Sequence, residues 1–234
     1  MVAVVGGVRI ASLYPNGTVW NQGADNRIQG DGMMRHKRMG LAGAVVLLGG
    51  LTSHAGALAQ TAGTAAEARA AVARAAESVT AGRPAEAVET LREATLAVWS
   101  AAPFDLVRIE TSATAAEGFR AYDPRGDAPV SAGDPLHLYI EPIGLAYEFV
   151  DGVYTMGLEA DFLLMDTGGA ILGGQRDFAA VPFAFHAPST DVYMTMTLGT
   201  ERLPAGDYLL QITVRDALSG TGVTREVPLS VTAP

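Results

Sequence analysis

Residues 203–216 read LPAGDYLLQITVRD, and this stretch decides the fold class. Successive side chains of a β-strand point to opposite faces, so a half-buried strand carries an apolar residue at every second position. The stretch shows this alternation, with one set of side chains suited to a core and one suited to a surface. The first set is Tyr208, Leu210, Ile212 and Val214, and the second is Leu209, Gln211, Thr213 and Arg215. The pattern predicts a β-strand with one buried face.

The same alternation recurs along the C-terminal part of the chain, in residues 136–141, 154–164, 192–198 and 227–231. Turn residues separate these runs, and Asp151-Gly152 is typical of a two-residue hairpin. Strands with one apolar and one polar face are typical of antiparallel sheets that share a core. We therefore predict that residues 103–234 form an antiparallel β-sandwich of about eight strands.

The corner before the strand that starts near Tyr208 carries a more specific signal. Leu203-Pro204-Ala205-Gly206-Asp207-Tyr208 resembles the corner before the penultimate strand of immunoglobulin and fibronectin type III modules. The resemblance implies an immunoglobulin-like sandwich in which Tyr208 is the corner tyrosine, its hydroxyl group bonded back to the main chain. More widely, residues 104–234 resemble uncharacterised exported bacterial proteins that end in such a sandwich. That family implies a location and a fold, and nothing catalytic.

Residues 60–102 are predicted to form a helical hairpin before the sandwich. The predicted fold class is therefore mainly β with an N-terminal helical hairpin. This region is rich in alanine, and its apolar residues recur at spacings of three and four. Gly82 suits the end of a first helix, and Pro84 suits the first turn of a second. Residues 81–88 resemble the turn of one tetratricopeptide-type repeat. A single repeat is not stable alone, so the hairpin must pack on the rest of the chain or on a partner.

The second helix of this hairpin has one apolar face, which includes Val88, Leu91, Val98 and Trp99. We predict that these side chains pack within the chain, and a partner is the alternative. The apolar face of the first helix is mostly alanine, whose small side chain buries little apolar area. The sandwich is therefore expected to fold without the hairpin.

A secretory signal pattern precedes the hairpin. A basic cluster at Arg35–Arg38 is followed by an apolar run at residues 39–51 and by Ala57-Leu58-Ala59. These three zones in this order predict a bacterial signal peptide at residues 33–59, cleaved before Gln60. The run is shorter than the roughly 20 apolar residues of a membrane span, so we expect no stable span after cleavage. Residues 1–32 are interpreted as a disordered extension upstream of the true start.

Composition excludes several classes of chemistry. The 234 residues include no cysteine, which excludes disulfides, thiolate metal sites and a cysteine nucleophile. The net charge is −9, whereas nucleic-acid binding needs a basic surface, so no nucleic-acid partner is expected. Residues 1–59 hold five of the 16 basic and two of the 25 acidic residues, so the mature chain carries a net charge of −12. It has no lysine, which excludes Schiff-base chemistry.

The mature chain contains few residues suited to catalysis. His137 and His186 are its two histidines, and they lack the spacing of a metal site. Glu141 alternates with the apolar residues of one strand, and Glu159 and Asp161 share a face of another. No motif of a serine nucleophile or of a dinucleotide-binding turn is present. We expect no metal and no cofactor.

Exposed aromatic residues suggest a surface that binds a partner instead. Tyr139 and Tyr193 alternate away from the predicted core, and with Tyr147 and Trp99 they are the candidate partner surface. The favoured hypothesis is a non-catalytic binding or protein-interaction module, periplasmic or secreted, that contacts another envelope protein. The alternative is a periplasmic enzyme that uses His137 and the acidic residues on a sheet face.

Overall fold

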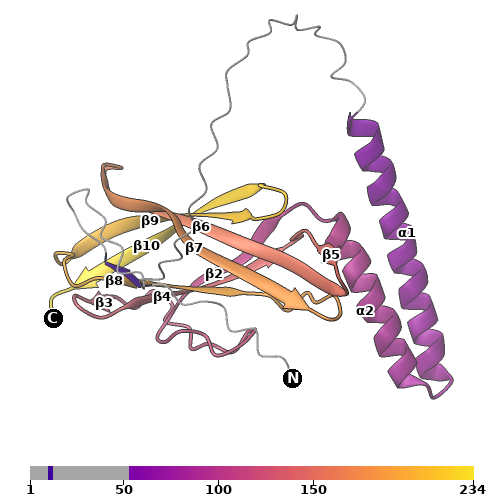
Figure 1. Cartoon of the computed structure of the whole chain (residues 1–234). Coiled ribbons are helices and arrows are strands. Elements are labelled where there is room, and N and C mark those ends of the chain that lie inside the picture. Colours follow the sequence, from indigo (N-terminus) through magenta and orange to yellow (C-terminus); the bar gives the residue numbers. More distant parts are fainter. Residues whose placement is uncertain (1–9, 13–52) are drawn as a thin grey trace, which may run out of the picture.

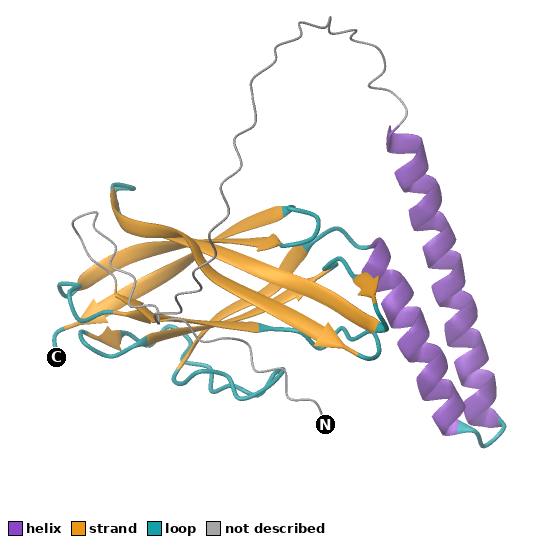
Figure 2. Cartoon of the chain, in the orientation of Figure 1, coloured by secondary structure: helices purple, strands orange, loops and turns teal. Residues whose placement is uncertain are grey.

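The computed structural model describes residues 10–12 and 53–234, with side chains from residue 65 onward. Most of the predicted signal peptide and of the predicted upstream extension lies outside the described residues. Within them, strands predominate, and two helices precede the sheets (Figure 2). The predicted division into helices followed by strands is therefore confirmed.

The two helices form an antiparallel hairpin. Helix α1 spans Ser53–Thr80, so it begins inside the predicted signal peptide, and α2 spans Pro84–Ala101. Gly82 ends α1 in the left-handed conformation, with φ of 74°, a region that glycine enters without strain. The residues buried between the helices are small: Ala71, Ala75, Ser78 and Ala87.

Nine strands follow the hairpin. They are β2 (Asp105–Ser112), β3 (Val130–Ser131), β4 (Leu136–Ile143), β5 (Glu148–Val150), β6 (Val153–Asp166), β7 (Ile171–Phe185), β8 (Met194–Gly199), β9 (Gly206–Asp216) and β10 (Gly222–Thr232). A further short strand, β1 (Ile10–Ser12), comes from the N-terminal region. The first sheet has the order β1-β8-β4-β2, and the second has the order β3-β10-β9-β6-β5, with β7 paired to β6 (Figure 1).

Two pairs of strands correct the prediction that the sheets are antiparallel. Strand β1 runs parallel to β8, and β3 runs parallel to β10, so both sheets are mixed. Each of these partners is only two or three residues long, too short for periodicity to reveal its direction. The longer ladders are antiparallel as predicted, including β6–β9 and β9–β10. Asp151 and Gly152 both have positive φ, as the predicted hairpin turn requires.

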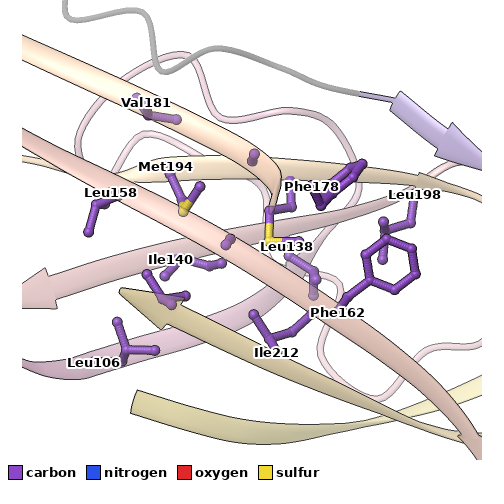
Figure 3. Close-up of a cluster of buried hydrophobic side chains, with 14 of the residues drawn as sticks. Leu106, Leu138, Ile140, Leu158, Phe162, Phe178, Val181, Met194, Leu198 and Ile212 are labelled. Atoms are coloured by element: carbon purple, nitrogen blue, oxygen red, sulfur yellow. The ribbon is translucent and has the colours of Figure 1, made fainter. Parts of the chain in front are cut away.

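The alternating apolar residues of both sheets meet in one core (Figure 3). Leu138, Ile140 and Met194 come from the first sheet, and Leu158 and Ile212 come from the second; all five are fully buried. Two facing sheets with a shared apolar core make a β-sandwich.

The hairpin lies beside one end of this sandwich, with α2 nearer to the sheets than α1 (Figure 1). Trp99 of α2 is buried and belongs to the same core, and its Nε1–H donates to the carbonyl oxygen of Leu145 at 3.0 Å. The packing of Trp99 within the chain is therefore confirmed. The sandwich core includes a residue of the hairpin, which periodicity alone could not show.

The corner before β9 has the predicted hydrogen bond. The Tyr208 hydroxyl donates to the Pro204 carbonyl oxygen at 2.7 Å, and the Tyr208 ring packs against the core while remaining partly exposed. Tyr208→Phe is expected to lower the free energy of unfolding by about 1 kcal/mol, because this bond is lost but water can reach the carbonyl. Chemical denaturation measures the change.

Tyr193→Phe is the comparison, because the Tyr193 ring stacks on Tyr139 and phenylalanine keeps that stacking. We expect it to cost less than about 0.5 kcal/mol. Equal losses of stability from the two substitutions would show that the corner hydrogen bond does not stabilise the fold.

Candidate functional site

A cluster of arginine, tyrosine and glutamate side chains lies on the outer face of the first sheet. Glu141 of β4 points away from the core and is only 3% exposed. The guanidinium group of Arg120, in the loop of residues 113–129, donates to Glu141 Oε1 at 2.6 Å through Nη2 and at 3.2 Å through Nε. The main-chain N–H of Arg120 donates to the Tyr139 hydroxyl at 3.0 Å. Arg120 thus ties the loop to the sheet through both its main chain and its side chain.

A second arginine completes the network. Arg108 of β2 donates to Glu110 at 2.6 Å, and its Nε atom lies 3.6 Å from Glu141 Oε2. The Tyr122 hydroxyl also donates to Glu110, at 2.8 Å. The hydrogen bond to Glu110 raises the pKa of Arg108, and the hydrogen bond to Glu141 raises the pKa of Arg120. Both guanidinium groups therefore stay charged beside the carboxylates.

Three tyrosine rings are stacked beside this network. The Tyr122 and Tyr139 ring centroids are 4.1 Å apart with 13° between the planes, and those of Tyr139 and Tyr193 are 5.6 Å apart. Burial raises the pKa of the Tyr139 hydroxyl to about 12. Such a hydroxyl stays protonated at neutral pH and acts here as a hydrogen-bond partner.

The burial of Tyr139 and Tyr193 corrects the prediction that they are exposed. Tyr139 is fully buried and Tyr193 is 5% exposed. The alternation correctly placed both on the face opposite the core. It could not show that a loop, carrying Tyr122, packs against this face.

The other two candidate residues lie elsewhere. Tyr147 follows β4, and its hydroxyl donates to the Ser189 carbonyl oxygen at 2.9 Å. Burial raises its pKa to about 12. Trp99 is buried where α2 meets Leu145. The structure therefore joins Tyr139 with Tyr193 but does not place all four residues on one exposed surface.

The residues of the alternative enzyme hypothesis are divided between opposite faces. His137 and Glu141 lie on the outer face of the first sheet, where His137 Nδ1 is 3.0 Å from Thr197 Oγ1. Burial, and to a smaller degree Arg125, lowers the pKa of His137. Glu159 and Asp161 alternate with core residues of β6, so they lie on the outer face of the second sheet.

Those two acids are held by Arg215, which contacts Glu159 at 3.5 Å and pairs with Asp161. Burial alone would raise the pKa of Asp161, but the hydrogen bonds from Arg215 and from the Asp177 N–H outweigh it and lower that pKa. An ionised carboxylate in such a pair is a poor proton donor at neutral pH.

A groove on the surface does not contain the residues of the enzyme hypothesis either. It lies between residues 124–128 and β10, and its charged lining includes Glu110, Arg125 and Glu226. None of the four residues of the enzyme hypothesis lines it. Across the described residues, no group of three or more metal-ligating side chains comes together.

The helical hairpin has an exposed apolar surface, although its apolar residues were predicted to pack within the chain. Of the four residues predicted to pack within the chain, Trp99 does so, but Val88, Leu91 and Val98 are 42–46% exposed. Val72 and Val79 of α1 are 57% and 58% exposed. The reason is that alanines, not these larger residues, occupy the contact between the helices.

Three of these exposed residues lie on one side of the hairpin. Val72, Val79 and Val88 each directly follow a residue that is buried between the helices. Each next residue of a helix is rotated by about 100° around the helix axis. In an antiparallel pair, the two helices run in opposite directions and turn their contact residues toward each other. The residues that directly follow the contact residues therefore lie on the same side of the pair. Leu91 follows Val88 by three residues and Val98 follows Leu91 by seven, so these two lie next to Val88 on the surface of α2. We call Val72, Val79, Val88, Leu91 and Val98 the hairpin apolar face.

The opposite side of the hairpin is charged. Residues that precede contact positions, such as Glu77 and Glu86, are exposed there. The hairpin is therefore amphipathic as a unit, with a solvated charged side and an apolar side.

Sequence periodicity does not identify Arg108, Arg120 or Tyr122 as residues of this cluster. Arg120 and Tyr122 lie in a loop, where no periodicity identifies a face, and Arg108 follows a register shift in β2. The segment Phe119-Arg120-Ala121-Tyr122, in which aromatic residues flank an arginine, is the feature of the sequence that could have indicated this cluster.

Among the described helices, neither is both long and apolar enough to cross a membrane. A scan against protein-family models finds no match, and a search of curated proteins finds no relative. Among solved structures, the fibronectin(III)-like modules of Clostridium thermocellum CbhA are similar at 12% identity with a TM-score of 0.23, covering 54% of this chain and 98% of that one.

A second similar structure is the Pseudomonas fluorescens alkylpurine DNA glycosylase AlkC bound to DNA containing an abasic site analogue. It is 10% identical with a TM-score of 0.28, covering 65% of this chain and 40% of that chain. Both TM-scores are too low to support an inference about function.

Proposed function

We propose that this protein is an exported, non-catalytic interaction module with an immunoglobulin-like or fibronectin III-like sandwich. Its location is the bacterial periplasm or the exterior, and its partner is another envelope protein. The observation that carries the proposal is the hairpin apolar face. Five large apolar side chains on the two helices are each more than two-fifths exposed, and three of them share one side of the hairpin.

Such a surface supports binding because exposed apolar area is costly in water. Single exposed apolar residues are ordinary, but a contiguous patch marks an interaction site. Helical hairpins of the tetratricopeptide type bury such faces against a neighbouring helix pair. We therefore expect a partner that presents an apolar helical face.

Export is tested by the mass of the product. When the full chain is expressed in a Gram-negative host, we expect a periplasmic species whose first residue is Gln60. Intact-mass spectrometry of the periplasmic fraction measures this. A species that retains residues 33–59, or one confined to the cytosol, would contradict the export proposal.

Binding is tested by photo-crosslinking in intact cells of the organism that encodes the protein. A photoreactive residue at position 91, on the hairpin apolar face, is expected to give a covalent adduct with another envelope protein. The matched control carries the same residue at position 93, because Glu93 is exposed on the other side of α2. Val88→Glu is expected to reduce the adduct from position 91 by introducing a charge into the contact. Equal adducts from positions 91 and 93 would count against the proposal.

A further inference from the structure

We infer that the free edge of β8 is a binding site for an extended, uncharged segment of another polypeptide, which adds a strand to the first sheet. This inference rests on the proposed cleavage before Gln60, because that cleavage removes β1. It concerns a surface and a mode of binding different from those of the hairpin apolar face.

Strand β8 has two neighbours. On one edge it pairs with β4 through an uninterrupted antiparallel register from Leu136↔Leu198 to Ile140↔Met194. On the other edge its partner is β1, in parallel, with Ile10 opposite Thr197 and Ser12 opposite Gly199. Residues 10–12 lie upstream of Gln60, so the processed chain has no β1 and β8 becomes the terminal strand of its sheet.

The other terminal strands carry features that prevent further pairing. Strand β2 has charged residues and a register shift after Leu106. Strands β3 and β5 are two and three residues long. Strand β7 carries Arg176 and Asp177 and pairs with β6 through two register shifts. Short length, charge and irregular register are the devices by which sheets avoid adding strands.

Strand β8 has none of these features. Its sequence, MTMTLG at residues 194–199, has no charge and no proline. Met194, Met196 and Leu198 are fully buried in the core, which fixes the register of the strand. The β-branched Thr195 and Thr197 occupy the opposite face and favour a strand. An edge of this kind is a template for an added strand.

The features of β8 and its occupant indicate what the added segment is like. The occupant is parallel to β8 and consists of Ile10-Ala11-Ser12, which are uncharged. Within the described residues it pairs with Thr197–Gly199, so a longer segment is needed to pair also with the edge at Met194–Met196. We expect a segment of about six residues with β-branched or small side chains.

The test uses the full chain and a labelled peptide with the sequence of residues 8–13, VRIASL, in which the one charged residue, Arg9, lies outside the pairing residues 10–12. A variant with Ile10→Pro, Ala11→Pro and Ser12→Pro cannot form β1, because proline has no N–H to donate and resists pairing within a sheet. Fluorescence anisotropy is expected to show binding to this variant at least tenfold tighter than to the unmodified chain. In the unmodified chain, the tethered β1 competes at a high effective concentration.

Two further measurements identify the site. The same peptide with N-methyl groups at Ile10, Ala11 and Ser12 keeps the side chains but loses the main-chain donors, and we expect it not to bind. Hydrogen exchange of the variant is expected to slow in Met194–Gly199 when the unmodified peptide is added.

Three results would overturn the inference: no binding to the triple-proline variant, equal binding of the methylated peptide, or protection outside β8. A doubled mass of the variant without peptide would also overturn it, since a second copy would then be the occupant. These results do not depend on export. The mass of the periplasmic product therefore tests the cleavage separately from the binding capacity of β8.

Discussion

Replacement of Trp99 by alanine is expected to lower the free energy of unfolding by about 3–5 kcal/mol. The Trp99 ring is buried in the core of the sandwich although it comes from α2. The substitution leaves a cavity where the ring packed and removes the 3.0 Å hydrogen bond to the Leu145 carbonyl oxygen. Chemical denaturation followed by circular dichroism gives the free energy of unfolding.

Val98→Ala is the matched control, because Val98 is the preceding residue of the same helix and is 45% exposed. Both substitutions shorten a side chain to alanine at neighbouring helical positions. Val98→Ala should change stability by no more than about 0.5 kcal/mol. If the two substitutions cost the same, Trp99 is not part of the core.

Because Trp99 is part of the sandwich core, a chain that lacks the hairpin is expected to be less stable than the full chain. The alanine-rich first helix suggested that the sandwich would fold without the hairpin. A chain that starts at Pro103 lacks Trp99, so it loses the same buried ring as the alanine variant. The close approach at Gly144, where a Cβ atom would lie 2.5 Å from the Pro103 carbonyl oxygen, shows that this junction is tightly packed.

The fold was largely predictable because two periodicities are local properties of the sequence. Alternation identified β4, β6, β8, β9 and β10, and spacings of three and four identified both helices. The Asp151-Gly152 turn followed from local turn chemistry, and the Tyr208 hydrogen bond followed from the resemblance to the corner of immunoglobulin and fibronectin type III modules. The parallel pairing of β3 with β10 was not predictable, because it depends on which distant segments meet.

The candidate surfaces were less predictable for a related reason. Alternation tells which residues share a face, but not what covers that face. Tyr139 was placed on the correct side of β4, yet the loop that carries Arg120 and Tyr122 buries it. In the hairpin, the small alanines fill the contact between helices, so Val88 and Leu91 remain exposed. Both outcomes depend on contacts between segments.

Glu141→Gln is expected to lower the free energy of unfolding by about 2 kcal/mol. Glutamine keeps the volume of Glu141 but removes the charge that holds Arg120 and Arg108. The loss is smaller than the roughly 3–5 kcal/mol seen when a wholly buried ion pair is broken, because the Arg120 side chain is 63% exposed and water can solvate it. The same denaturation measurement detects the change.

Glu89→Gln provides the control for this substitution. Glu89 pairs with Arg92 at 2.7 Å, but both side chains are about two-thirds exposed, at 67% and 69%. An exposed pair contributes little, so we expect a loss below about 0.5 kcal/mol that shrinks further in high salt. The loss from Glu141→Gln should persist in high salt, because Glu141 itself is buried. Arg120→Gln should cost less in the Glu141→Gln background than in the unmodified protein, since its partner is already neutral. Additive effects of these two substitutions would show that the loop of residues 113–129 is not held to the sheet by this ion pair.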